Sequence, residues 1–328
     1  MPTTQSPIVG LLSRLNSVGI PSTFARKMLP VWWEDEIASD PAGLQQAQLY
    51  LARAFNIDLR SLASRQGKPE FKASLRKFKL SKNVTEDMVS LSANYVTGIA
   101  RLVLQAEPSR QQCPVPGDPA TLRSEILVDH PCVSLQALLA WCNKSGIPVL
   151  HIDKVPGRKM TGLVVRNDGR FAIVLSKKGH PALLLFHLAH ELGHIARGHL
   201  SADGFVADVK IDTTNGDADE KEADAYAIRL LNGAEVRYGT NGPMPSAKVL
   251  FKAAVAKGLQ EQVDPGHIIA NFGHNQSRYA QAAEALKLID GAQQGGDVIN
   301  EAFFSALNQD RLSDDQLDLL KIATSYSR

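Results

Sequence analysis

The chain of 328 residues is long enough for two or three domains, and its 44% hydrophobic and 21% charged content is typical of globular proteins. With 36 basic and 34 acidic residues the net charge is only +2, so the overall charge argues neither for nucleic acid nor for a membrane surface as a partner. The three cysteines form no CxxC pair, which fits a reducing compartment. Because no membrane span or secretory leader is recognisable, we expect a cytoplasmic protein without a membrane partner.

Residues 1–106 show the apolar spacing of amphipathic helices, for example in FARKML and GLQQAQLYLARAF. The next segment, residues 107–120, holds four prolines and a glycine, a composition that sustains neither a helix nor a central strand. We therefore predict a helical N-terminal domain over 1–106 and a linker over 107–120, followed by domains at 121–240 and 241–328.

Between residues 60 and 82 the first domain is strongly basic, with eight basic residues against the single acid Glu70 and a local net charge of +7. Such a run is usually a solvated helix face, but it also fits an anionic partner such as DNA, and the sequence leaves both interpretations open. The candidate contacts to DNA are Arg65, Lys68, Lys72, Arg76, Lys77 and Lys79.

Helix and strand patterns alternate in the region 121–240. SLQALLAWCNKSG predicts a helix that ends at Gly146, and the β-branched segment IPVLHI predicts a strand. GLVVR and RFAIVL flank the Asn-Asp-Gly sequence at 167–169, whose residues tolerate positive φ, so we predict a β-hairpin. From Pro181, PALLLFHLAHELGHIAR predicts one helix that ends at Gly198.

A further helix is predicted after an acidic segment. Asp217 and Glu220 have the spacing of a capping box just before EADAYAIRLL, so we expect this helix to begin near Asp217 and to end at Gly233. Residues 241–328 have helical patterns throughout, including a second capping box in SDDQ, and we predict a small helical C-terminal domain.

The candidate chemistry lies in HELGH, an HExxH pattern inside the predicted helix. Because residues four apart lie one turn above each other, His190 and His194 can direct two imidazoles at one metal ion. Catalytic zinc usually has three protein ligands and an exchangeable water, so a third ligand must come from elsewhere. Glu191 borders the same face and is the expected general base for that water. The alternative is that both histidines lie at the surface and bind no metal.

The third ligand has many candidates in the segment 201–224. Its carboxylates are Asp203, Asp208, Asp212, Asp217, Asp219, Glu220, Glu222 and Asp224. We predict Glu222, since it lies inside the second helix and the small Ala223 and Ala225 beside it let that helix approach the first. Asp219 is a candidate partner for a ligand histidine or a stabiliser of the helix N-terminus, and Tyr226 is a further candidate for contact with the ligands.

Two other histidines flank the motif. His199 follows His194 by five residues, whereas the longer motif HExxHxxGxxH requires six, so we interpret His199 as a helix-end cation. His187, one turn before His190, is expected either to line the cleft or to be a partly buried histidine with a satisfied partner. Zinc is the expected metal, with manganese and iron as alternatives.

Together, FHLAHELGHIARGHL and the later EKEADAYAIRLL resemble the ImmA/IrrE family of metallopeptidases, over roughly residues 121–235. Asp224 and Tyr226 stand where that family usually has asparagine and phenylalanine. The resemblance implies zinc ligands at His190 and His194, a ligand at Glu222 in the second helix, and a catalytic base at Glu191.

The resemblance also implies a mainly helical α+β fold, in which a zincin-like peptidase domain with a small mixed sheet is flanked by helical N- and C-terminal domains. It further implies cleavage of a helix-turn-helix repressor or an antitoxin, and thereby regulation of mobile-element or stress-response genes. RFAIVL is then expected to hold an extended substrate by strand addition. LARAFNIDLRSL in turn resembles the last helices of a helix-turn-helix domain.

Three functions are therefore considered. The leading hypothesis is a zinc endopeptidase that acts on a protein partner, such as a DNA-binding repressor or antitoxin. The second is a DNA-binding transcriptional regulator whose peptidase-like domain is a sensor or docking platform. The third is an interaction module whose N-terminal helices bind the substrate or a sister subunit.

Overall fold

The computed structural model of the protein describes residues 6–64, 66–72, 75–79, 85–106, 111–208, 218–291 and 293–327. Over these residues the chain forms fourteen α-helices and one five-stranded mixed sheet, so it is a mainly helical α+β protein, as predicted. The helices are α1 (Pro7–Asn16), α2 (Ser22–Arg26), α3 (Pro41–Ala54), α4 (Leu59–Ala63), α5 (Glu86–Ala106), α6 (Pro119–Leu127), α7 (Leu135–Lys144), α8 (Pro181–Ala196), α9 (Ala218–Asn232), α10 (Ala247–Glu261), α11 (Pro265–Asn275), α12 (Tyr279–Asp290), α13 (Gly295–Ala306) and α14 (Asp314–Thr324). The strands are β1 (Leu75–Lys79), β2 (Val149–His151), β3 (Gly162–Asn167), β4 (Arg170–Leu175) and β5 (Gly204–Asp208).

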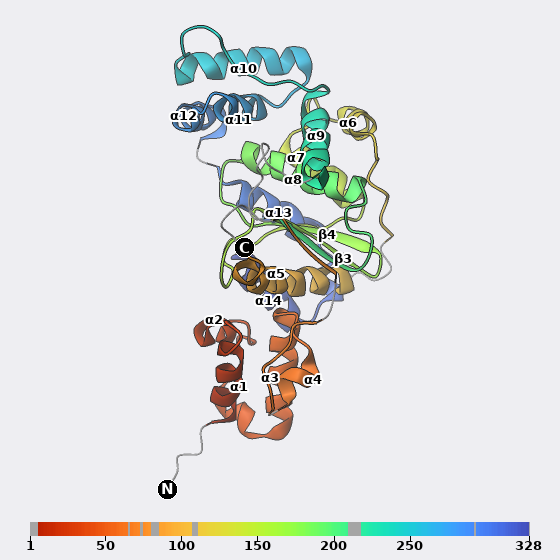
Figure 1. Cartoon of the computed structure of the whole chain (residues 1–328), viewed down its shortest axis with the longest axis vertical. Coiled ribbons are helices and arrows are strands. Elements are labelled where there is room, and N and C mark those ends of the chain that lie inside the picture. Colours follow the sequence, from red (N-terminus) through yellow and green to blue (C-terminus); the bar gives the residue numbers. More distant parts are fainter. Residues whose placement is uncertain are drawn as a thin grey trace.

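The sheet lies in the middle of an elongated molecule, with α1–α4 at one end and α10–α12 at the other (Figure 1). Its strands have the order β1-β5-β3-β4-β2, in which β3 is antiparallel to both neighbours and the two outer ladders are parallel. β3 and β4 form the predicted hairpin, whose turn places Asp168 and Gly169 at φ of 52° and 74°. These turn residues therefore have the positive φ that we predicted from their residue types.

β4 is an interior strand. It pairs with β3 on one side, and on the other with β2 and with the side chain of Gln112, which binds the backbone of Phe171. The expectation that RFAIVL holds a substrate by strand addition is therefore wrong, because both edges of this strand are already occupied.

The strand β1 departs from the prediction of helices throughout 1–106. Phe78 packs edge-on against Phe205 of β5, with ring centroids 5.3 Å apart. Lys77 points to the opposite face, where its Nζ donates to the carbonyl oxygen of His199 at 2.7 Å. This alternation defines a strand, and in the sequence the surrounding basic residues obscure it.

Two helices cover the two faces of the sheet. α5 packs on one face, against a core that includes Leu163 and Val165 of β3. α8 packs on the other face, against Val164 of β3 and Ile173 of β4. Because α7, α9 and α13 also contact α8, this helix is buried on several sides.

The predicted division into domains stays a prediction, although one apolar core crosses its boundaries. That core joins Leu15 of α1, Ile99 of α5, Val165 of β3 and Leu320 of α14. The described part of residues 241–328 is helical, as predicted, but it packs in two places. α10–α12 form a separate cluster, whereas α13 lies beside β2 and α14 contacts α5.

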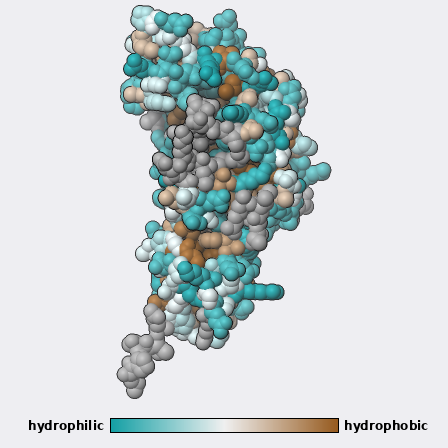
Figure 2. Space-filling model, viewed as in Figure 1, coloured by the Kyte–Doolittle hydropathy of each residue, from teal (hydrophilic) through white to brown (hydrophobic). Residues whose placement is uncertain are grey.

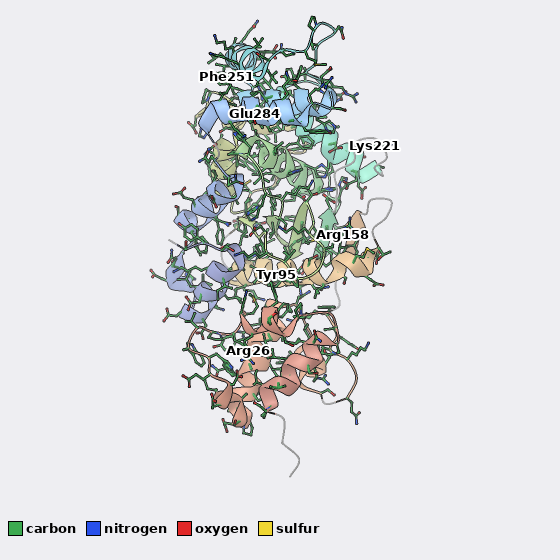
Figure 3. All side chains as sticks on the ribbon, turned by 90° about the vertical axis from the view of Figure 1, so that its left-hand side faces the viewer. Arg26, Tyr95, Arg158, Lys221, Phe251 and Glu284 are labelled. Carbon is green, nitrogen blue, oxygen red and sulfur yellow. The ribbon has the colours of Figure 1, made fainter. Side chains whose placement is uncertain are left out.

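The surface in Figure 2 is mostly hydrophilic, with small hydrophobic areas between the polar ones. Within the described ranges, none of the helices has both the length and the apolar composition that crossing a bilayer requires. Figure 3 places Tyr95 of α5 inside the molecule, whereas Lys221 of α9 lies at its outer edge.

Candidate metal centre

The helix α8 carries the HExxH residues into the interior. It begins at Pro181, as predicted, and the Nδ1 atom of His180 accepts a hydrogen bond from the amide of Ala182. The side chains of His190, Glu191 and His194 are fully buried, so the alternative of two surface histidines is wrong. The predicted one-turn spacing brings the Nε2 atoms of the two histidines within 3.1 Å of each other.

Two carboxylates from other elements complete the cluster. Asp208, the last residue of β5, places Oδ2 3.2 Å from Nε2 of His190 and 3.2 Å from Nε2 of His194. Glu220, in the first turn of α9, lies 3.6 Å from His190 and 3.3 Å from His194. One ligand atom from each of these four buried side chains lies within 4.8 Å of the others, so the group can hold a metal ion.

Glu222 was the predicted third ligand, and the structure places it elsewhere. Its side chain is 58% exposed and lies 3.4 Å from Nε2 of His199, outside the buried cluster. The reason is the phase of α9, because Glu220 and Asp224 are four residues apart and share one face, from which Glu222 is turned away. Glu220 takes the position that we expected Glu222 to have.

The close approach of α8 and α9 that we inferred from small residues is confirmed at Ala223. A Cβ atom added to Gly193 of α8 would lie 2.9 Å from the Cα of Ala223. Backbone contact of this kind needs glycine on one helix and a small residue on the other. It places Glu220, in the first turn of α9, directly beside the two histidines.

The outer nitrogen of each histidine has its own partner. Asp224 Oδ1 lies 2.9 Å from Nδ1 of His190, and Nδ1 of His199 lies 2.8 Å from Nδ1 of His194. Both contacts leave the Nε2 atoms directed at the centre of the cluster. Partners of this kind fix the tautomer and the orientation of metal-binding histidines.

The prediction that His199 is a helix-end cation is wrong. The residue is only 6% exposed, and its burial together with the neighbouring His194 lowers its pKa below the usual value. When His194 uses Nε2 for a metal, its Nδ1–H donates to His199, and His199 then faces Glu222 with its own Nε2–H. His199 is thus a neutral link between the cluster and the surface.

The remaining candidates for contact with the ligands lie further out. Asp219 lies 3.8 Å from His199 Nε2 and 3.9 Å from Lys77 Nζ, so it does not partner a ligand histidine directly. Tyr226 donates its hydroxyl to the carbonyl oxygen of Pro116 at 2.8 Å and fills the apolar core. Asp224, which we had weighed only as a possible ligand, has one of the two roles for which Asp219 was a candidate, as the partner of a ligand histidine.

His187 lies one turn before His190 and is largely buried. Burial, with Lys177 and His190 nearby, lowers its pKa to about 3, so its ring is neutral. Its Nδ1 atom finds no hydrogen-bond partner among the described residues, so the expectation of a satisfied histidine is wrong for that atom.

The carboxylate of Glu191 is fully buried beside the cluster. Neither oxygen finds a hydrogen-bond partner among the described residues. Burial raises the pKa of Glu191 well above the usual value, and the charge of Asp208 adds to the shift. A Cβ atom on Gly162 would lie 1.9 Å from Oε1 of Glu191, so only glycine at the start of β3 leaves room for this carboxylate.

The electrostatics of the cluster fit a bound cation. Burial opposes the charged form of His190, but hydrogen bonds with Asp208, Asp224 and Glu220 outweigh it and raise the pKa. Burial likewise opposes the charge on His194, yet Asp208 and Glu220 raise its pKa to about 9. The buried carboxylates therefore favour positive charge at the cluster. Either protons on the imidazoles or a bound metal ion can provide that charge.

Of the six basic candidates for DNA contact, only three have described side chains. Arg65 lies outside the described residues, as do the side chains of Arg76 and Lys79. Lys68 and Lys72 are exposed, whereas Lys77 is bound to the carbonyl oxygen of His199. Contact of this region with DNA stays a prediction.

From the sequence we did not predict the roles of three residues in and around the cluster, which are Asp208, Glu220 and Asp224. Glu220 and Asp224 carry a usable signal, since an ExxxD spacing repeats the four-residue step of HExxH and places two carboxylates on one helix face. Asp208 ends the alternating segment GFVAD, but nothing local indicates that this strand ends over α8. Comparison of the chain with protein-family models, with curated proteins and with solved structures found no significant match.

Proposed function

We propose that this protein is a zinc-dependent endopeptidase, with His190, His194 and Glu220 as zinc ligands and Glu191 as the general base. The observation that carries the proposal is the carboxylate of Glu191, which is buried next to the ligand cluster without a partner among the described residues. A structural metal site has no use for such a group, because burying an unpartnered carboxylate is costly. A peptidase site requires it.

The chemistry follows from the positions of these side chains. Zinc bound by them would polarise the scissile carbonyl and lower the pKa of a water molecule towards about 7. Glu191 would accept the proton of that water and pass it to the leaving amine. Asp224 and His199 hold the rings of His190 and His194 in the orientation that this geometry needs.

The peptide-binding edge belongs to a different strand from the one that we first expected. Among the described residues, β1 forms a ladder with β5 alone, so one of its edges is available for strand addition. The last residue of β1, Lys79, is aligned with Asp208, so this edge ends next to the cluster. An extended substrate could pair with this edge through its main chain. The carboxylate of Glu191 lies further in, against Gly162 of β3, so strand addition at β1 would anchor the substrate rather than position the bond that is cleaved.

The proposed substrate is a protein partner, for which a helix-turn-helix repressor or an antitoxin is the candidate that the resemblance to the ImmA/IrrE family implies. No contact in the structure selects among such partners. The support for an endopeptidase lies in the edge strand β1, which could pair with the main chain of an extended peptide whatever its side chains.

A second candidate function, a DNA-binding regulator, is supported by a gathering of cations near Lys72. Partial burial of this otherwise exposed lysine lowers its pKa, as do the charges of Arg101 and Arg53, whereas the carboxylate of Asp58 opposes them. Like charges kept close together fit a phosphate backbone. DNA affinity that falls steeply with salt, and less steeply in Lys72→Ala, would support this function, whereas no binding at low salt would exclude it.

The test of the peptidase uses Glu191→Gln, which keeps the shape of the side chain. We expect the variant to bind zinc as the wild type does and to lose the basal cleavage of casein, an unfolded probe substrate. Glu222→Gln, an exposed acid on α9, is the matched control and should keep both properties. Cleavage retained by Glu191→Gln would contradict the role of Glu191 as base.

A further inference from the structure

Asp208 is one carboxylate more than a catalytic zinc site requires. His190, His194 and Glu220 already form the usual three-ligand set, and a water or substrate oxygen normally takes the fourth position. Yet Oδ2 of Asp208 lies at the same distance, 3.2 Å, from both Nε2 atoms, and its side chain is completely buried. A metal ion held by the histidines would therefore meet a fourth protein ligand.

The direction from which Asp208 approaches is informative. Its partner across the β3–β5 ladder is Gly162, and the carboxylate of Glu191 lies directly against Gly162. Asp208 therefore reaches the cluster from the side of the general base. The water on which Glu191 acts must lie between the base and the metal, so Asp208 and this water compete for the same region.

The two acids of the cluster are anchored differently. Glu220 belongs to α9, which is fixed on α8 by the backbone contact at Gly193 and shares its face with Asp224, the partner of His190. Asp208 is the last residue of its strand, and its backbone oxygen accepts a hydrogen bond from the amide of Thr161 at 2.6 Å. The main chain of Asp208 is thus held, so withdrawal of the carboxylate would require rotation of the side chain rather than movement of the strand.

We propose that Asp208 is a fourth metal ligand that restricts access of water to the metal, so that the peptidase is latent, with only a low basal activity, until this side chain is withdrawn. The inference rests on the proposed function, since a latent state has meaning only for a catalytic site. It explains why an HExxH helix with its base in place is accompanied by a complete set of four protein ligands, an arrangement otherwise typical of structural zinc.

Cobalt substitution tests the coordination directly. Metal-free protein is loaded with Co²⁺, and the visible absorption spectrum is recorded before and after addition of acetohydroxamate, a small chelator that needs an open position on the metal. We expect no spectral change in the wild type and a clear change in Asp208→Ala. Asp203→Ala is the matched control, an acid that binds the hairpin turn beyond the other end of β5, and it should behave as the wild type does.

Two further measurements accompany the spectra. Zinc affinity, from competition with a chromophoric chelator, should fall in Asp208→Ala by more than the roughly 10–100-fold that the loss of a supporting partner costs, because a direct ligand is removed. Casein cleavage should rise severalfold, and Glu191→Gln in the Asp208→Ala background should abolish it. Asp208→Asn keeps the volume of the side chain and should show the same changes if the alanine variant folds poorly.

The outcomes separate the two proposals. If acetohydroxamate changes the wild-type cobalt spectrum as it changes that of Asp208→Ala, the fourth coordination position of the metal is already open. Asp208 then does not block it, while the peptidase proposal stands. If the variants lose metal and gain no cleavage, Asp208 is a structural ligand, and the proposal that it keeps the peptidase latent is again wrong. If the wild type binds neither zinc nor cobalt, the metal centre itself fails.

Discussion

The helices α5 and α8 pack on opposite faces of the same two strands, and they bury polar groups in different ways. In α5 the buried polar residues Ser92, Asn94 and Thr97 are neutral. Ser92 and Asn94 have hydrogen-bond partners, whereas the hydroxyl of Thr97 finds none among the described residues. Ser92 donates to the carbonyl oxygens of Val89 and Arg158, and Asn94 donates to that of Ser90. In α8 the buried polar residues are ionisable, and their partners are carboxylates of other elements.

This difference between the two helices shows which kind of buried polar group identifies the candidate site. A buried hydroxyl or amide that finds a hydrogen bond within one turn carries no information about function. A buried carboxylate without a partner, next to two histidines that share two further carboxylates, is unfavourable unless a cation is bound or a proton is transferred. Only α8 has this arrangement among the described helices that cover the sheet.

The largest effect is expected for the metal ligands on α9. Glu220→Ala should weaken zinc binding by more than the roughly 10–100-fold typical of a lost supporting partner, because it removes a ligand. Glu222→Ala, two residues away and exposed, should leave the affinity unchanged. Chelator competition measures both, and the reverse order of effects would restore Glu222 as the ligand.

Removal of the metal comes next. At a free zinc concentration of one hundred times Kd, binding should stabilise the folded protein by about 2.7 kcal/mol, so chelation should lower Tm. The effect should vanish in His190→Ala and persist in Ser92→Ala, since only α8 contributes to the centre. Calorimetry with and without chelator measures it, and an equal response of all three proteins would contradict the contrast between the helices.

Two tightly packed glycines, one in each helix, allow the packing of α5 and α8 to be compared. A Cβ atom would lie 2.4 Å from the carbonyl oxygen of Ala54 at Gly98 of α5, and 2.9 Å from the Cα of Ala223 at Gly193 of α8. Gly98→Ala and Gly193→Ala should each destabilise the fold by about 1–3 kcal/mol through overpacking. Only Gly193→Ala should also weaken zinc binding, because it moves α9 and Glu220 away from the histidines. Equal zinc affinities in both variants would contradict this view of α9.

The smallest effect is expected at Ser92 itself. Ser92→Ala removes a hydroxyl that donates to Arg158 at 2.6 Å and should lower the free energy of unfolding by about 1 kcal/mol. Zinc affinity and casein cleavage should not change. Denaturant unfolding together with a zinc titration tests this, and a loss of zinc affinity would show that the two faces of the sheet are coupled.

The parts that the sequence predicted are those determined by neighbouring residues. The hairpin turn, the start of α8 at Pro181 and the one-turn spacing of His190 and His194 all depend on local geometry. The choice between Glu220 and Glu222 depends on which face of α9 meets α8, and this is a property of tertiary packing. The strand β1 depends on pairing with β5, more than one hundred residues away, and the position of Asp208 depends on the pairing of β5 with both β1 and β3, which no local pattern reveals.

The most direct test of the metal centre is a crystal structure of the zinc-loaded protein with anomalous diffraction data at the zinc edge. The account predicts one strong peak about 2.0–2.2 Å from Nε2 of His190 and His194 and from Glu220, with the carboxylate of Asp208 as the fourth ligand. A protein without zinc at this position, or with zinc bound by Glu222 instead of Glu220, would contradict it.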